Sequence, residues 1–227
     1  MKILVINPNT TVSMTNKIAT VARAVARPDT EIIAASSHDG PASIQGFLDV
    51  ATCVPGLLKE VAQHKDVDAI VIACFDDTGL DAVRTLMSVP VLGIGEAAYH
   101  AASMIANKFS VITTLSRSVP GLENNLMRYG LAQKCSRVRA TEIPVLKLEE
   151  GDPATLDKIR SAIRASIDED NAEAIVLGCA GMADLMAQLS EEFGLPVIDG
   201  VSASVAFAEA LVNNRLSTSK IGAYSYN

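Results

Sequence analysis

The chain has 227 residues, of which 49% are hydrophobic and none is Trp, and its formal net charge is −7. This length allows one large domain or two small ones. No apolar run reaches the roughly 18 residues that a membrane-spanning helix needs. The chain has more acidic than basic residues and no cluster of basic residues along the sequence. This argues against binding to nucleic acid or to an anionic membrane surface.

We expect a cytoplasmic protein with reduced cysteines and no metal or cofactor. Residues 1–9, MKILVINPN, lack the long apolar region and the cleavage site of a signal peptide, and they are typical of a first strand. In such a chain, four Cys residues are expected to remain thiols. Their spacing contains no CxxC, and the three His residues form no HxH or HExxH pattern. The GxG at residues 93–95 lacks the third glycine of a dinucleotide-binding fingerprint.

The first half of the chain alternates short apolar runs with helical stretches. Strands are predicted at residues 2–6, 31–35, 70–73 and 89–94, and helices at residues 14–27, 47–64, 79–87 and 97–106. Pro8 ends the first strand, and the Asn and Thr residues around it can cap the helix that follows. Residues 36–46, SSHDGPASIQG, form a long loop at a strand end, where loops tend to carry function.

The pattern then restarts, with similar segments separated by a constant 105 or 106 residues. Residues 108–114, KFSVITT, resemble residues 2–8, KILVINP, and residues 196–198 resemble residues 90–92. This repetition indicates a duplicated βαβαβαβ unit. Because strands and helices alternate, each unit should form a four-stranded parallel sheet with right-handed crossovers. The expected fold is therefore α/β, with two pseudo-symmetric lobes, helices flanking each sheet and an active site in the cleft between them.

We place the first lobe at residues 1–97 and the second at residues 98–205. A last helix is predicted at residues 203–211. We expect the carboxyl-terminal helix and tail, residues 206–227, to cross back and pack on the first lobe, because the second unit is complete before them.

Two cysteines occupy equivalent places in the two units. In residues 67–79, VDAIVIACFDDTG, Cys74 follows the apolar run at residues 70–73. In residues 172–182, AEAIVLGCAGM, Cys179 occupies the matching place. Both therefore lie at the carboxyl end of a buried strand, which is where open α/β sheets bind their ligands. Two thiols on opposite sides of a cleft suit inversion at a carbon acid. One thiolate removes the proton from one face, and the other thiol returns a proton to the opposite face.

The turns after the two cysteines carry most of the candidate substrate contacts, which are Phe75, Asp76, Asp77, Thr78, Ala180 and Gly181. We expect the dipole of the helix that follows to lower the pKa of each thiol, and backbone N–H groups to hold a developing enolate oxygen. Further candidates are Asn9, Ile44 and Thr114, on strand ends and in the loop at residues 36–46.

Simpler roles remain open for several of these residues. A single buried cysteine is often a small core residue, but the duplicated placement of Cys74 and Cys179 argues for a function. Cys53 and Cys135 have no partner in the repeat and are interpreted as structural. Asp76, Asp77 and Asn9 can instead be helix caps, and so can Thr113 and Thr114 at the corresponding strand end of the second half.

Several motifs resemble those of the aspartate/glutamate racemase superfamily over nearly the whole chain. They are the NPNT start, the ACFDDTG turn, the VPVLGIGEA strand and the GCAGM turn, and they are most similar to the hydantoin racemase branch, with allantoin racemase as close kin. The resemblance implies cofactor-independent racemisation of 5-monosubstituted hydantoins, with Cys74 and Cys179 as the acid/base pair. It also implies a homo-oligomer.

The chain departs from the amino-acid racemases of this superfamily, which typically carry Cys-Asn-Thr and Cys-Thr-His. Here the triplets are Cys74-Phe75-Asp76 and Cys179-Ala180-Gly181, without the groups that would hold a free amino acid. Asp76 and Asp77 would repel a carboxylate but accept from ring N–H groups, which favours a hydantoin. The alternatives are an allantoin racemase, a one-cysteine decarboxylase or cis–trans isomerase of the same fold, and a non-catalytic two-lobe binding protein.

Overall fold

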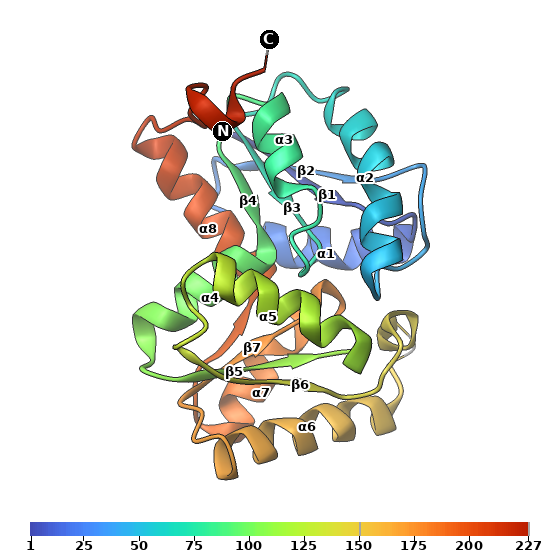
Figure 1. Ribbon diagram of the computed structural model, residues 1–227, viewed down its shortest axis with the longest axis vertical. Coiled ribbons are helices and arrows are strands. Elements are labelled where there is room, and N and C mark those ends of the chain that lie inside the picture. The colour runs from blue at the N-terminus through green and yellow to red at the C-terminus, as the bar shows by residue number, and fades with distance from the viewer. Residues whose placement is uncertain (150, 227) are drawn as a thin grey trace.

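Each half of the chain builds its own four-stranded parallel sheet, and the two sheets lie in separate lobes (Figure 1). The computed structural model describes residues 1–149 and 151–226. The strand orders are β2-β1-β3-β4 and β6-β5-β7-β8, so the same topology occurs twice. The strands are β1 (Lys2–Asn7), β2 (Glu31–Ser36), β3 (Ala69–Ile72), β4 (Val91–Gly93), β5 (Phe109–Thr113), β6 (Cys135–Ala140), β7 (Ala174–Leu177) and β8 (Val197–Asp199). The expected fold class is confirmed.

Helices connect the strands in both lobes. The α-helices are α1 (Val12–Val25), α2 (Phe47–Val61), α3 (Leu80–Leu86), α4 (Ile94–Ile105), α5 (Val119–Arg128), α6 (Pro153–Asp168), α7 (Met186–Phe193) and α8 (Gly200–Asn213). Short 3₁₀ segments are η1 (Ser116–Ser118), η2 (Val145–Glu149), η3 (Ala180–Leu185) and η4 (Gly222–Tyr224). The fourth helix begins at Ile94, which was expected to end a strand, because a distant carboxylate caps its first N–H groups, as described below.

The central strands are the most buried parts of the chain. Every residue of β3 and β7 is buried, as their unbroken β-branched and aliphatic runs indicate for strands covered on both faces. One apolar cluster includes residues of both sheets, and Tyr99 belongs to it. The Tyr99 ring meets Phe75 edge-on at 5.2 Å and Phe109 at 6.2 Å between centroids. The lobes therefore share one core at their junction.

The helix that leaves each sheet packs across the junction. Helix α4 leaves the first sheet and contacts β7 and β8, whereas α8 leaves the second sheet and contacts α1, β3 and β4. The two helices also pack on each other, and a Cβ at Gly200 would lie only 2.2 Å from the Ile94 carbonyl oxygen. Figure 1 shows α8 beside the strands of the first lobe. This exchange of helices brings the ends of the two sheets together.

The carboxyl-terminal tail lies against α3 and β4. Thr218 Oγ1 donates to the Val89 carbonyl at 2.6 Å, Lys220 Nζ donates to the Arg84 carbonyl at 2.6 Å, and Tyr224 donates to Asp81 at 2.9 Å. No helix within the described residues is long and apolar enough to span a membrane.

Replacement of Glu209 tests how α8 is attached to the first lobe. The buried Glu209 carboxylate accepts from the Arg27 N–H at 2.9 Å and from Thr30 Oγ1 at 2.6 Å. Glu209→Ala leaves both donors without this partner, so we expect the free energy of unfolding in urea to fall by about 2 kcal/mol. The control is Glu192→Ala, which removes only a partly exposed ion pair with Arg160 and should cost less than about 1 kcal/mol. Equal losses would contradict this role of Glu209.

Candidate active site

A small cavity lies where the carboxyl ends of the central strands of the two lobes meet. The volume open to the centre of a water molecule is about 30 Å³. Eight of the residues singled out from the sequence line this cavity, namely Asn9, Ile44, Cys74, Phe75, Asp76, Thr114, Cys179 and Ala180. Both thiol-bearing residues thus reach one space from different lobes.

The two cysteines are delivered by equivalent backbone arrangements. Beyond β3, the Ala73 N–H donates to the Ile6 carbonyl, and beyond β7, the Gly178 N–H donates to the Ile112 carbonyl, both at 2.8 Å. The ladder therefore continues up to the residue before each cysteine. Each chain then turns, and the N–H of the third residue after the cysteine donates to the cysteine carbonyl at 3.0 Å. The pattern VIAC and VLGC thus produces the same local structure twice.

Cys74 is partly buried, and its sulfur lies beside a carboxylate. Its Sγ lies 3.9 Å from Asp76 Oδ2 and 3.8 Å from Thr78 Oγ1. Burial, and secondly the Asp76 charge, raise the pKa of Cys74 well above its usual value, while the Asp76 N–H and the Thr78 hydroxyl act in the opposite direction. The expectation of a pKa lowered by a helix dipole is wrong for Cys74, because α3 begins only at Leu80 and burial dominates.

Asp76 is the acidic group nearest to this thiol. Burial raises the pKa of Asp76 to about 6. Its backbone carbonyl accepts from Asn125 Nδ2 at 2.9 Å, which ties the turn to α5 of the other lobe. A carboxyl group with this pKa exchanges protons readily near neutral pH, so Asp76 is suited to tuning the thiol or to meeting a substrate N–H.

Asp77 lies outside the cavity lining and caps helix α4. Its carboxylate accepts from the N–H groups of Gly95 at 2.9 Å and Glu96 at 2.7 Å, and from Tyr129 at 2.7 Å. Burial raises the pKa of Asp77 to about 7. A Cβ at Gly93 would lie 2.0 Å from the same carboxylate, which explains the GxG sequence there. The expectation that Asp77 offers an acceptor to the substrate is therefore wrong.

Thr78 and Gly181 also lie outside the residues that line the cavity. Thr78 is buried behind Cys74, where its hydroxyl faces the sulfur. The Gly181 carbonyl accepts from Lys17 Nζ at 3.1 Å. Both residues thus support the cysteine turns rather than the space between them.

Asn9 is oriented by its neighbours. Its amide oxygen accepts from Asn7 Nδ2 at 2.8 Å and from the Thr11 N–H at 2.9 Å. Its Nδ2 faces the weak acceptor Met14 Sδ at 3.4 Å. The side-chain N–H groups of Asn9 can therefore donate to a ligand in the cavity.

Thr113, which was weighed with Thr114 at the strand end of the second half, also lines the cavity. Sequence reasoning did not select six other residues that line it: Met14, Ala73, Ser118, Leu122, Val145 and Gly178. Met14, Ser118 and Leu122 lie at or near the start of the helices that follow β1 and β5. Their position in the sequence could therefore have identified them as lining residues. Val145 begins the short 3₁₀ segment η2, and its N–H donates to Gln45 Oε1 of the first lobe at 3.0 Å. No periodicity in the sequence marks that contact.

Cys53 and Cys135 lie outside the cavity, and burial raises the pKa of Cys53 to about 11 and that of Cys135 to about 12. The four cysteines form no disulfide bond with one another. Over residues 1–149 and 151–226, no cluster of three or more His, Cys, Asp or Glu side chains is placed to hold a metal ion.

The fold and the cavity define a two-lobe α/β protein with a thiol from each lobe at a shared site. The chain belongs to the Asp/Glu/Hydantoin racemase family, whose model matches residues 3–208. Hydantoin racemases from Rhizobium meliloti and Pseudomonas sp. (strain NS671) are 48% and 45% identical to it, over 100% of this chain and 95% and 92% of their own. The protein is thus an isomerase of the racemase type.

Solved structures agree with this assignment. Allantoin racemase from Klebsiella pneumoniae has a TM-score of 0.97 and 44% identity, over 100% of this chain and 94% of its own. Allantoin racemase from Pseudomonas fluorescens has a TM-score of 0.96 and 42% identity, over 100% and 97%. Glutamate racemase from Campylobacter jejuni, at 22% identity and a TM-score of 0.64 over 92% and 85%, shares the fold.

Replacement of Asp76 tests the electrostatic control of Cys74. Asp76→Asn removes a negative charge that raises the pKa of the thiol, so the pKa of Cys74 should fall. The measurement is the pH dependence of Cys74 alkylation by iodoacetamide, followed on the Cys74 peptide by mass spectrometry. Asp66→Asn, which changes an exposed carboxylate of the same lobe, serves as the control and should leave the profile unchanged. An unchanged or raised pKa in Asp76→Asn would contradict the assignment.

Proposed function

We propose that the protein racemises 5-monosubstituted hydantoins at C5 with two thiols and without a cofactor. The observation that carries the proposal is that Cys74 and Cys179, on equivalent strand ends of different lobes, line one cavity. The names of the hydantoin racemases at 45% and 48% identity support the substrate class. The protein is inferred to act as a homo-oligomer, as members of this family generally do.

In the proposed reaction, the C5–H bond lies between the two sulfur atoms. One thiolate takes the C5 proton, and the electron pair of the C–H bond moves into the neighbouring carbonyl to form an enolate. The other thiol then donates its proton to C5 from the opposite face and becomes the thiolate. The protons and the charge are conserved in this cycle. The enzyme is left in the protonation state that reacts with the opposite enantiomer. The raised pKa of Cys74 keeps it a thiol at neutral pH, which suits it to act first as the proton donor.

Other groups around the cavity can bind the rest of the hydantoin ring. Asn9 Nδ2 and the backbone N–H groups of Phe75 and Ala180 serve as donors to the carbonyl oxygen on which the enolate charge develops. Asp76 accepts from a ring N–H. A C5–H beside a carbonyl, in a ring that takes up the enolate charge, is acidic enough for a thiolate to remove without an electron-sink cofactor. The absence of an amino-acid carboxylate from such a substrate removes a repulsion with Asp76.

A second cavity adjoins the first and provides space for the C5 substituent. It measures about 170 Å³ and shares Asp76 and Ser118 with the thiol cavity. The thiol cavity has less free space, since only about 30 Å³ of it is open to the centre of a water molecule. We therefore place the ring between the thiols and the substituent in this side pocket, against Phe47 and Val50.

Allantoin, a hydantoin with a ureido group at C5, is the second candidate substrate. The observation in its favour is the polar part of the side pocket, where Arg117 and Asn124 can bond a ureido group. The names of the allantoin racemases at 44% and 42% identity also support it. The catalytic step would be the same, and only the substituent contacts would differ.

The two-thiol mechanism predicts complementary defects in Cys74→Ala and Cys179→Ala. Each variant should lose racemisation of 5-benzylhydantoin but keep C5 proton exchange with D₂O on one enantiomer, a different one for each variant, because one thiolate remains to deprotonate one face. The measurement is proton NMR of each enantiomer in D₂O. Full racemisation by either variant would contradict the mechanism, and no exchange by the wild type would contradict the substrate assignment.

Phe47→Ala tests the place of the C5 substituent. Loss of the aromatic wall should lower kcat/KM for 5-benzylhydantoin roughly tenfold, equivalent to about 1.4 kcal/mol, and change it little for 5-methylhydantoin. Leu48→Ala is the matched control, because Leu48 is 76% exposed on the same helical turn and lies outside the side pocket. Equal losses for both substrates would place the substituent elsewhere.

A further inference from the structure

We propose that the first helix of each lobe positions the thiol of the other lobe. Lys17 on α1 holds the turn of Cys179, and Asn125 and Tyr129, on and directly after α5, hold the turn of Cys74. These are positioning residues rather than catalytic ones, and the proposal rests on the two-thiol mechanism above.

Lys17 fixes the turn that follows Cys179. Its Nζ donates to the Gly181 carbonyl at 3.1 Å and pairs with Asp184 at 3.2 Å, so both contacts fall on η3. On another side of the turn, a Cβ at Gly181 would lie 3.1 Å from Leu148 Cδ1. The turn is therefore confined between a cation of the first lobe and an apolar side chain of the second. A charge-assisted hydrogen bond of this kind is among the stronger ones in proteins.

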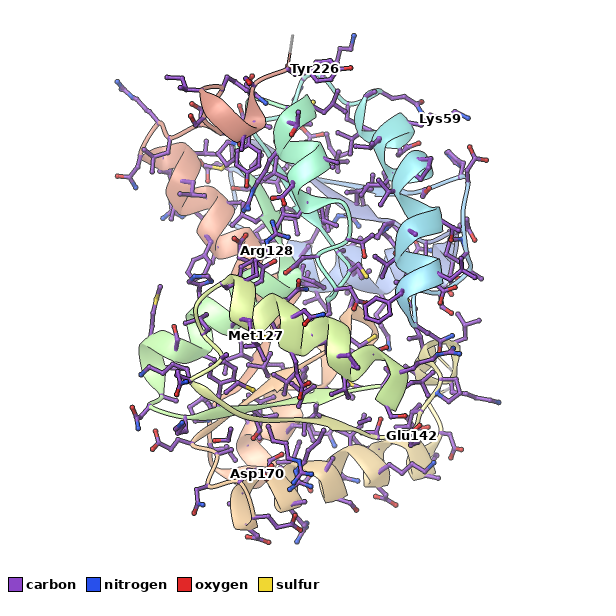
Figure 2. All side chains as sticks on the ribbon, viewed as in Figure 1. Lys59, Met127, Arg128, Glu142, Asp170 and Tyr226 are labelled. Atoms are coloured by element: carbon purple, nitrogen blue, oxygen red, sulfur yellow. The ribbon has the colours of Figure 1, made fainter. Side chains whose placement is uncertain are left out.

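The turn that follows Cys74 is held from the opposite direction. Asn125 Nδ2 donates to the Asp76 carbonyl at 2.9 Å, and the Tyr129 hydroxyl donates to Asp77 Oδ2 at 2.7 Å. Arg128, labelled on α5 in Figure 2, extends the contact by pairing with Asp81 of α3. The bonds from Asn125 and Tyr129 reach the second and third residues after the cysteine, so they act where the direction of the sulfur is set.

The duplication explains why the two contacts are reciprocal. Helices α1 and α5 are equivalent in the repeat, because each follows the first strand of its lobe. Their chemistry differs, however, since a cation acts on the Cys179 turn and neutral amide and hydroxyl groups act on the Cys74 turn. The two contacts can therefore be removed separately. A displacement of about 1 Å in a reacting group can cost 100-fold in rate.

Lys17→Met and Tyr129→Phe test the proposal through C5 exchange in D₂O on each enantiomer of 5-benzylhydantoin. We expect racemisation to fall about 10- to 100-fold in each variant. Lys17→Met should keep exchange on the same enantiomer as Cys179→Ala. Tyr129→Phe should keep exchange on the same enantiomer as Cys74→Ala. Lys17→Arg, which keeps the charge and donors, should retain most of the rate. Asn125→Ala is a second variant for the Cys74 turn, with the same expected enantiomer as Tyr129→Phe.

The controls remove similar contacts away from both turns. Lys59→Met removes an exposed ion pair with Asp39 at 3.0 Å, on the outer side of α2 (Figure 2). Thr218→Val removes a hydroxyl that donates to the Val89 carbonyl at 2.6 Å. Both should leave racemisation and the exchange ratio of the enantiomers unchanged.

Two results would overturn the proposal, and they are distinguishable. If the positioning variants slow exchange of both enantiomers equally, or change neither, while the cysteine variants keep opposite preferences, the positioning roles are wrong and the two-thiol mechanism stands. If the cysteine variants themselves show no opposite preference, the mechanism is wrong and the positioning roles fall with it.

Discussion

The backbone hydrogen bond that closes the turn after each cysteine is the constraint on which the site depends. In both lobes the N–H of the third residue after the cysteine donates to the cysteine carbonyl at 3.0 Å, directly beyond a fully buried strand. A buried strand cannot shift without breaking its ladder and its packing. The turn therefore presents each side chain at a fixed place. Helices α4 and α8 pack across the junction between the lobes, and this packing brings the two cysteines to one cavity.

The two thiols share a backbone arrangement but differ in their surroundings. Cys74 lies beside the Asp76 carboxylate, whereas the residues after Cys179 are Ala180 and Gly181. Because two enantiomers have equal free energies, kcat/KM must be the same in both directions, whatever the difference between the thiols. The asymmetry can therefore affect which protonation state predominates and how the substituent is bound, but not the final ratio of products.

Much of the fold could be predicted because it is repeated. The apolar runs before Cys74 and Cys179 indicated buried strands, and their common spacing indicated two lobes with equivalent ends. The direction of Asp77 could not be predicted. Its backbone has a φ of 52°, in a region that few residues adopt, and its carboxylate reaches an α4 N-terminus that is distant in the sequence. Val145 was missed because it lies in a short 3₁₀ segment, which carries no periodic signal in the sequence.

Racemisation in D₂O shows whether two different groups act on opposite faces of C5. One enantiomer of 5-benzylhydantoin is mixed with the wild-type enzyme in D₂O, and circular dichroism is followed to equilibrium. With two bases, the signal should cross zero before it returns, because the product carries deuterium at C5 and reverts more slowly than the protonated substrate reacts. A signal that decays to zero without crossing it, with deuterium entering the remaining substrate as fast as the product, would show that a single base acts and would exclude the two-thiol mechanism.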